Sequence, residues 1–482
     1  MSITSALNAA SSGLQVTGQR AEVVANNVAN ASTPGFVRRA LNVGENLVGG
    51  QTIGVTSNGV QRQTSDALTQ ERLSLSSDLT QSNILTSAWQ SISDQLGNSL
   101  DENGLFQAFS DFETTLSNAA TTPESTANLS ALLSAADNIA QEFNTLSNDL
   151  EDLRSQTDRQ IAQGVDAVNE ALAQIQELNT QIAGTPLNSN KAASLFDERQ
   201  RQLNTIAEYL PIQTATRDSG TIDVLTKEGV FLLSSNARTI EFSQSTGFGP
   251  DQTLASGALS GLSVDGTDIT PGAATFGAIS SGSLGALFQL RDQDLPQLSD
   301  QLDTLAADLI TRLSDDSIDP TKTAGAAGLF VDSDNLASPG IAQRISLNSA
   351  IDPNAGGSVF RLRDGIEAVT EGPPGNNTIL TNLLSAVTSV ESVNANGLQG
   401  NFSSTQLAAQ LTSVVGQTSV NHETVQSSTL AQHSALVEAE TTQTGVDIDA
   451  QLQELLLIEQ AYAANARIIE VASQLLNQLL EI

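Results

Sequence analysis

Few residues of this chain could do chemistry, and the first to consider are two histidines in a sequence without cysteine. His422 and His433 are eleven residues apart, so on one helix they share a face but lie about 16 Å from each other along it. That separation excludes the binding of one metal ion by both. His422-Glu423 begins like the His-Glu-x-x-His helix of zinc peptidases, but the second histidine is missing. An exposed helix residue is therefore the favoured interpretation.

Other catalytic patterns are also missing from the sequence. It has no Gly-x-Ser-x-Gly elbow, no phosphate-binding P-loop and no Gly-x-Gly-x-x-Gly after a strand. Adjacent carboxylates such as Asp315-Asp316 and Glu151-Asp152 are plentiful, and in so acidic a chain they indicate solvated surface. We expect no enzyme activity, no cofactor and no metal site. A hydrolase within the β-type segment 211–281 is the weakest alternative, because no nucleophile and base can be named for it.

Charge and composition exclude further classes. With 54 acidic and 20 basic residues among 482, the net charge is −34, and no cluster of basic residues is available to neutralise nucleic-acid phosphates. No apolar run approaches the 18 or so residues of a membrane span, and the N-terminus lacks the basic and apolar regions of a signal peptide. We expect a soluble protein of about three domains that binds neither nucleic acid nor membrane.

The first 28 residues predict a long helix with one apolar seam. Its apolar positions alternate in steps of four and three: Ile3, Leu7, Ala10, Leu14, Ala21, Val24 and Val28, with Thr17 as the interruption. Asn26, Asn27 and Asn30 are poor mid-helix residues, and Thr33-Pro34-Gly35-Phe36 fits a type II turn. The helix should therefore end at a sharp corner.

The last helix carries a second heptad series: Ile448, Leu452, Leu455, Tyr462, Ala466, Ile469, Leu476 and Leu480. Single helices are only marginally stable, so we predict that the two terminal helices pair in a coiled-coil-like inner domain formed by residues 1–60 and 441–482. Their seams should also pack between subunits. The predicted subunit-packing residues are Leu7, Leu14, Val24, Val28, Leu452, Tyr462, Ile469 and Leu476.

Between the ends, the period of the apolar residues changes twice. Helical spacing predicts a stem domain from residues 61–210, 282–315 and 376–440, and its longest helix starts at Thr122-Pro123 and runs about 90 Å to residue 183. Residues 37–63 read as a connector with short extended pieces. A small β domain is predicted for 211–281, and 316–375 is loop-rich or β. The fold class is mainly α with inserted β, in an elongated multi-domain protein.

The ends of the chain resemble the bacterial flagellar rod, hook and hook-associated proteins. The stretch from Val24 to Phe36 resembles their N-terminal signature, and Glu459-Gln-Ala-Tyr-Ala-Ala-Asn-Ala-Arg467 resembles their C-terminal one. The residues that match are Asn26, Asn27, Asn30, Pro34, Gly35, Phe36, Tyr462, Asn465 and Ala466.

The middle of the chain is similar to the hook-associated branch of that family. The similar parts are Leu195-Phe-Asp-Glu-Arg-Gln before the β segment, and Gly282-Ser-Leu-Gly-Ala-Leu-Phe-Gln-Leu-Arg-Asp292 at the start of a long helix. Segment 313–320 departs from the family, which usually has an Asn and a His there.

The resemblance implies a structural subunit that joins hook to filament and is required for filament assembly and motility. It implies four partners: further copies in a ring, the hook protein, a second hook-associated protein on the filament side, and a cytoplasmic export chaperone. It also implies a location in the extracellular flagellum, reached through the flagellum's own type III export without a cleaved signal peptide. Another axial subunit, of the hook or the distal rod, is the alternative.

Overall fold

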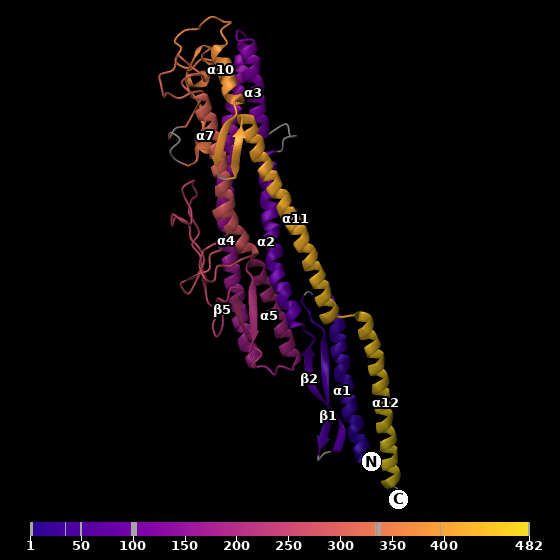
Figure 1. Ribbon diagram of the computed structural model, residues 1–482. Coiled ribbons are helices and arrows are strands. Elements are labelled where there is room, and N and C mark those ends of the chain that lie inside the picture. The colour runs from indigo at the N-terminus through magenta and orange to yellow at the C-terminus, as the bar shows by residue number, and fades with distance from the viewer. Residues whose placement is uncertain are drawn as a thin grey trace.

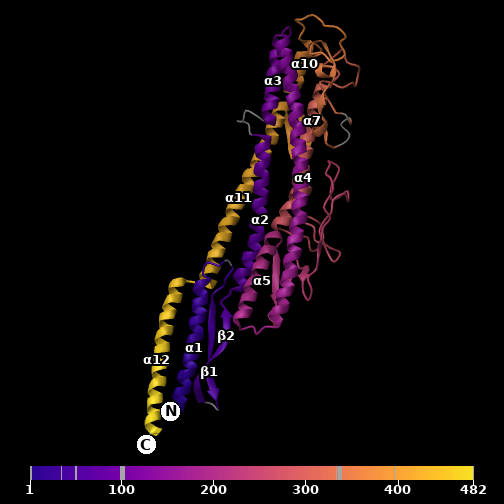
Figure 2. The same ribbon diagram turned by 180° about the vertical axis from the view of Figure 1, so that it is seen from behind.

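The molecule is elongated, and both termini lie at the same end of it (Figure 1). This computed structural model describes residues 3–33, 35–48, 51–97, 104–332, 334, 339–395 and 397–480. Long helices run up the molecule and back down, so the first and last helices meet at one end while short helices and loops gather at the other (Figures 1 and 2). The predicted fold class, mainly α with small β parts, is confirmed.

The end that holds the termini consists of two helices and a hairpin. α1 (Ile3–Ala29) lies against α12 (Ile448–Leu480), and β1 (Arg39–Val48) pairs antiparallel with β2 (Gln51–Arg62) beside α1. The predicted corner after α1 is confirmed in the described residues. The Phe36 N–H donates to the Thr33 carbonyl at 3.1 Å, and Gly35 has φ +77°. Pro34 lies outside the described residues.

The extended pieces predicted for residues 37–63 are longer than expected, because they form one long hairpin. Its alternation is weak in the sequence since the register shifts between Asn42 and Val43 and again between Asn46 and Leu47. Gly54 lets the hairpin approach α1 closely, because a Cβ there would collide with Ser12.

Besides the helix of segment 282–315, the stem contains six helices in the described parts of segments 61–210 and 376–440. They are α2 (Asp66–Leu96), α3 (Leu105–Thr121), α4 (Thr126–Ala183), α5 (Asn190–Tyr209), α10 (Thr378–Thr388) and α11 (Ser404–Thr444). The prediction of one continuous long helix is confirmed by the 58 residues of α4. Its predicted start at Thr122-Pro123 is wrong, because Ser125 caps the helix by accepting from the Asn128 N–H at 3.2 Å.

The β part between α5 and α6 (Gly282–Gln289) consists of two three-stranded antiparallel sheets. β3 (Ile212–Thr216), β4 (Ile222–Thr226) and β5 (Phe231–Leu233) form one, and β6 (Ile240–Glu241), β7 (Ser263–Val264) and β8 (Thr267–Asp268) form the other. The sequence did not single out β3. The domain boundaries drawn from the sequence stay a prediction.

After α6 the helix widens into a π-helical turn, η1 (Leu290–Asp294), and continues as α7 (Leu295–Leu313). The loop-rich region that follows holds β9 (Phe330–Val331), α8 (Ile341–Arg344), β10 (Ser346–Leu347), η2 (Pro353–Ala355) and α9 (Arg361–Asp364).

Within the predicted helical segment 376–440, a hairpin corrects the prediction. β11 (Glu391–Ala395) pairs antiparallel with β12 (Leu398–Phe402), between α10 and α11. The sequence signal was the Asn-Gly dipeptide at 396–397, which favours a tight hairpin turn. α11 ends at Thr444, four residues beyond the end of the predicted stem segment.

Two apolar clusters form the core, and neither includes a described residue of α1 or α12. One fills the far end, where Phe109 and Phe143 meet edge to face with ring centroids 5.9 Å apart. The other joins α4 and α5 to the β part. The terminal helices therefore depend on each other and on the hairpin for their packing.

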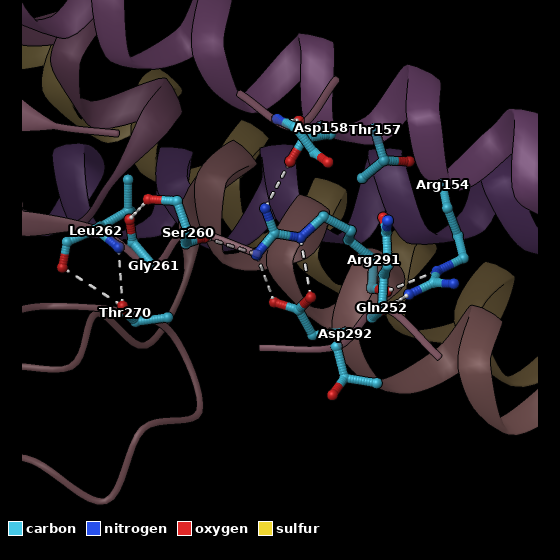
Figure 3. Close-up of polar contacts among 12 residues, drawn as sticks. Arg154, Thr157, Asp158, Gln252, Ser260, Gly261, Leu262, Thr270, Arg291 and Asp292 are labelled. Atoms are coloured by element: carbon cyan, nitrogen blue, oxygen red, sulfur yellow. Dashed lines mark hydrogen bonds and ion pairs between the residues drawn. The ribbon is translucent and has the colours of Figure 1, made fainter. Parts of the chain in front are cut away.

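Two buried arginines fix the loop between β6 and β7 against α4 (Figure 3). The Arg291 guanidinium, fully buried, donates to Asp158 Oδ1 at 2.6 Å and to the Ser260 carbonyl at 2.9 Å. The Arg154 guanidinium donates to the Gln252 carbonyl at 2.7 Å and to the Arg291 carbonyl at 3.3 Å. These guanidinium groups thus satisfy the carbonyls of Gln252 and Ser260, which no strand ladder pairs.

Replacing Arg291 by Met should therefore destabilise the stem strongly. The change leaves the Asp158 carboxylate buried without its cation, which costs about 3–5 kcal/mol in the free energy of unfolding. Urea unfolding measures it. Arg159→Met, which changes the residue next to Asp158 on the exposed face of α4, is the matched control and should stay within about 0.5 kcal/mol of the parent. Equal stabilities for the two variants would contradict this account.

Both histidines lie on α11 and face α2. The His422 ring stacks on Trp89 at 6.1 Å, and Trp89 Nε1 donates to Asp294 Oδ2 at 3.3 Å. His433 Nε2 is 3.1 Å from Ser76 Oγ. Burial lowers the pKa of His422 although Asp294 opposes it, and burial together with the nearby Arg72 lowers the pKa of His433.

These shifts predict that acid weakens the packing of α11 on α2. The unfolded chain takes up these protons first as the pH falls through about 6.5, so stability is lost on going from about pH 7.5 to about pH 5.5. Thermal midpoints at the two pH values measure the loss. The double variant His422→Gln, His433→Gln should lose less than the parent does. An identical pH dependence would show that the histidines are not responsible.

Candidate functional site

The contact between α12 and α1 uses a row of residues seven apart on α12. Gln451, Ile458 and Ala472 are buried there, and the half-buried Asn465 completes the row. Asn465 fits because α1 has glycine opposite it: a Cβ on Gly13 would lie within 3.0 Å of the Asn465 side chain. The pair is therefore built from close approach of small groups as well as from apolar contact.

The predicted heptad face of α12 is corrected by this row. Leu452 and Tyr462 stay 47% and 52% exposed, whereas Ile469 and Leu476 are half-buried at the edge of the contact. The heptad pattern of apolar residues predicted leucines in this contact, but the row that lies closest to α1 contains Asn465 and Ala472. Of the predicted seam residues of α1, Val24 is buried, while Leu7, Leu14 and Val28 are half-buried.

Asn27 connects three elements at the corner. Its amide nitrogen donates to the Arg39 carbonyl and to Gln451 Oε1, both at 2.8 Å, and its oxygen accepts from the Arg39 N–H at 3.0 Å. The residue is buried, so it joins α1 to the base of the hairpin and to the start of α12. This gives a physical role to one residue of the N-terminal signature.

The other signature residues are more exposed. Asn30 Nδ2 donates to the Asn26 carbonyl at 2.9 Å, and Phe36 packs its ring under the Arg39 guanidinium at 4.8 Å. On α12, Ala466 is exposed beside the half-buried Asn465.

A buried carboxylate ties this end to the stem. Asp197, in the Leu195-Phe-Asp-Glu-Arg-Gln motif of α5, accepts from Arg39 and Arg62 at 2.8 Å each. These arginines lie opposite each other at the base of the hairpin. The Arg38 N–H also donates to the Thr444 carbonyl at 2.9 Å, which attaches the end of α11. We call this set of contacts the joint.

Apolar side chains of α12 lie exposed on both sides of its contact with α1. The first flank is Ile448, Leu452, Leu455 and Tyr462, and the second flank is Leu457, Ile468, Val471 and Leu475; these eight are 40% to 65% exposed. Ile468, Val471 and Leu475 of the second flank line a groove of about 490 Å³ together with Ile3 of α1. Exposed apolar surface of this extent marks an interaction site.

The second flank was missed in the sequence, because a heptad template accepts only one stripe. Its signal was the run Leu455-Leu-Leu-Ile458, which places apolar side chains around the whole helix. The assembly role of the predicted packing residues stays a prediction.

A metal site and a membrane span are not features of the described residues. Among them, no three His, Asp or Glu side chains are close enough together to hold a metal ion. Within those same ranges, no helix is both long and apolar enough to cross a bilayer.

Comparison with known proteins gives matches in two parts of the chain. Residues 90–327 match the helical domain of the flagellar hook-associated protein FlgK, and residues 7–36 match the flagella basal body rod protein family. Flagellar hook-associated protein 1 of Escherichia coli (strain K12) is 26% identical over 321 residues, which cover 63% of this chain and 55% of that protein. Its counterpart in Salmonella typhimurium is 26% identical over 314 residues, with the same shares.

A solved structure is similar at lower identity. The flagellar hook junction protein FlgK from Burkholderia pseudomallei aligns with a TM-score of 0.44 and 18% identity, over 55% of this chain and 47% of that one. The chain spans about half the length of the curated relatives that it matches. Residues 90–327 are thus similar to the helical domain of the flagellar hook-associated protein, and residues 7–36 carry the signature of the flagellar rod protein family.

Proposed function

We propose that this protein is a structural subunit of the bacterial flagellum, an adaptor at the junction of hook and filament that filament assembly and motility require. The observation that carries the proposal is the pair of exposed apolar flanks on α12, one on each side of its contact with α1. A helix with two such flanks can contact neighbouring copies on both sides, as a closed ring needs.

The mechanism of such an adaptor is packing. Each leucine or isoleucine that becomes fully buried contributes about 1.5–3 kcal/mol, so eight partly exposed side chains can supply a large contact energy per copy. The same end carries α1, α12 and the hairpin, whereas the stem and the β part extend away from it (Figure 1). We infer that this end forms an inner layer and that the stem contacts neighbours further out.

The resemblance to axial proteins extends the proposal to partners and location. The hook protein would contact one side of the ring and a second hook-associated protein the filament side. The chain would be made in the cytoplasm, held by an export chaperone, and exported to the extracellular flagellum without a cleaved signal. The match to the hook-associated helical domain over residues 90–327 favours this function over that of a hook or distal rod subunit.

Leu452→Asp combined with Tyr462→Asp tests the first flank. Both side chains are exposed, so the monomer should keep its thermal midpoint within a degree or two. Assembly should fail, because the contact would bury two unpaired charges at several kcal/mol each. Cells that carry the variant should make hooks without filaments and lose motility, measured by electron microscopy and swimming assays.

The control is Gln453→Asp with Gln460→Asp, which adds the same charge at exposed polar positions of α12. These cells should swim. Normal filaments in cells that carry the Leu452→Asp, Tyr462→Asp variant would contradict the proposal. A large fall in the thermal midpoint of the monomeric variant would contradict it as well. If the variant is absent from the medium, a secretion assay decides whether export failed first.

The chaperone can be tested with a shortened chain that ends at Asp447, just before α12 begins. An apolar helix exposed in the cytoplasm needs a cover, so we expect the shortened chain to lose chaperone binding at least a hundredfold in calorimetric titration. Full-length protein with the Gln453→Asp, Gln460→Asp changes is the control and should bind normally. Undiminished binding by the shortened chain would place the chaperone site elsewhere.

A further inference from the structure

Two cavities adjoin the joint. Their volumes are about 390 and 460 Å³, and they share six lining residues: Arg62, Thr64, Asp66, Phe196, Arg199 and Thr216. The shared wall comes from the end of the hairpin, the start of α2, α5 and β3. Cavities of this size hold a small molecule or one side chain.

Arg199 is a buried charged group in this wall whose donors are only partly used. It is 9% exposed, and its Nη1 donates to Asn179 Oδ1 at 3.1 Å and to the Gly220 carbonyl at 2.7 Å. Among the residues that the structure describes, its Nε and Nη2 have no hydrogen-bond partner, and no carboxylate lies within ion-pair distance. A buried guanidinium normally has a counter-ion.

Other arginines of the chain use that same edge. In three pairs, Nε and Nη2 donate side by side to the two oxygens of one carboxylate, at distances of 2.6 to 3.2 Å. The pairs are Arg291 with Asp292, Arg344 with Asp332, and Arg363 with Asp364. In these three arginines, the Nε and Nη2 edge binds a carboxylate. In Arg199 the same edge has no acceptor among the described residues, although Arg199 lines both cavities.

The surrounding charges favour an anion there. The Arg62 guanidinium lies 5.9 Å from the Phe196 ring centroid and that of Arg199 lies 5.0 Å from it, so two cations contact one aromatic ring. Burial, and then the charge of Arg62, lower the pKa of Arg199 to about 10. Two of the nearby acids have other cations: Asp197 is held by Arg39 and Arg62, and Glu440 by Arg72. Asp66 also lines both cavities, but it is exposed and forms no ion pair with Arg199 in the described structure.

We propose that this cavity is a carboxylate-binding site, in which the Nε and Nη2 edge of Arg199 holds both oxygens of the ligand. The carboxylate has two possible sources, a free small acid or an acidic side chain of a second copy of this highly acidic chain. The site lies at the joint, so its occupant would bridge the hairpin, α2 and α5. This inference does not depend on the proposed function.

The test uses sodium acetate as the probe, titrated against sodium chloride at constant ionic strength. Carbon-13 acetate line broadening reports binding directly to the full chain. We expect saturable binding that weakens at least tenfold in Arg199→Gln and in Arg199→Lys, because lysine keeps the charge but lacks the two-pronged edge. Arg201→Gln, which removes an exposed arginine two residues along α5, is the control and should bind as the parent does.

The outcomes are distinct. Acetate that fails to saturate the parent, or that binds the Arg199 variants as well as the parent, overturns the proposal. Arg199→Lys guards against loss of fold in Arg199→Gln, since an ammonium can still donate to Asn179 and Gly220. Repeating the titration on assembled protein separates the sources. Retained binding supports a free acid, and loss of acetate binding on assembly supports a carboxylate from the second copy.

Discussion

The shape of this molecule depends on one buried carboxylate shared by two arginines. Asp197 is 5% exposed, and it holds Arg39 and Arg62 across the base of the hairpin. Through them the terminal helices are attached to α5 and so to the stem, although those helices contribute nothing to either apolar cluster. Removing one partner of a buried ion pair costs far more than replacing the whole pair, so the three charges can only change together. That constraint explains why polar contacts, and not an apolar core, fix how the end that carries the apolar flanks is joined to the stem.

The contact between α1 and α12 follows from a second constraint, the need to bring two helix backbones close together. Gly13 leaves room for Asn465, and Asn27 uses its side-chain amide to hold the hairpin and the start of α12. Close approach through small and amide side chains leaves the larger apolar residues of α12 at the sides of the contact. The residues that would be the core of a simple coiled coil therefore remain available to other chains.

Much of this fold could be predicted from the sequence, because most of its helices are long and strictly periodic. α1 and α4 were predicted within a few residues, since their apolar seams are local signals. The hairpins were harder. β1 and β2 are interrupted by bulges, and β11 and β12 are five residues each. Within the candidate site, Asn27 and Asp197 belong to motifs that were recognised, but their contacts are 12 to more than 400 residues distant in sequence. No local pattern encodes which partner a buried polar group will meet.

The net negative charge of the chain opposes association of free copies through the exposed apolar flanks. Arginines are scarce, and several of them are buried. Each of Arg39, Arg154, Arg199 and Arg291 donates to backbone or side-chain acceptors. Because these arginines are buried, acidic residues dominate the surface, and the net charge of the chain is −34. Free copies therefore repel one another, most strongly at low ionic strength. In the proposed ring, each copy would offer two flanks and further stem contacts at once, so association would become favourable when the copies are held in the geometry of the assembly.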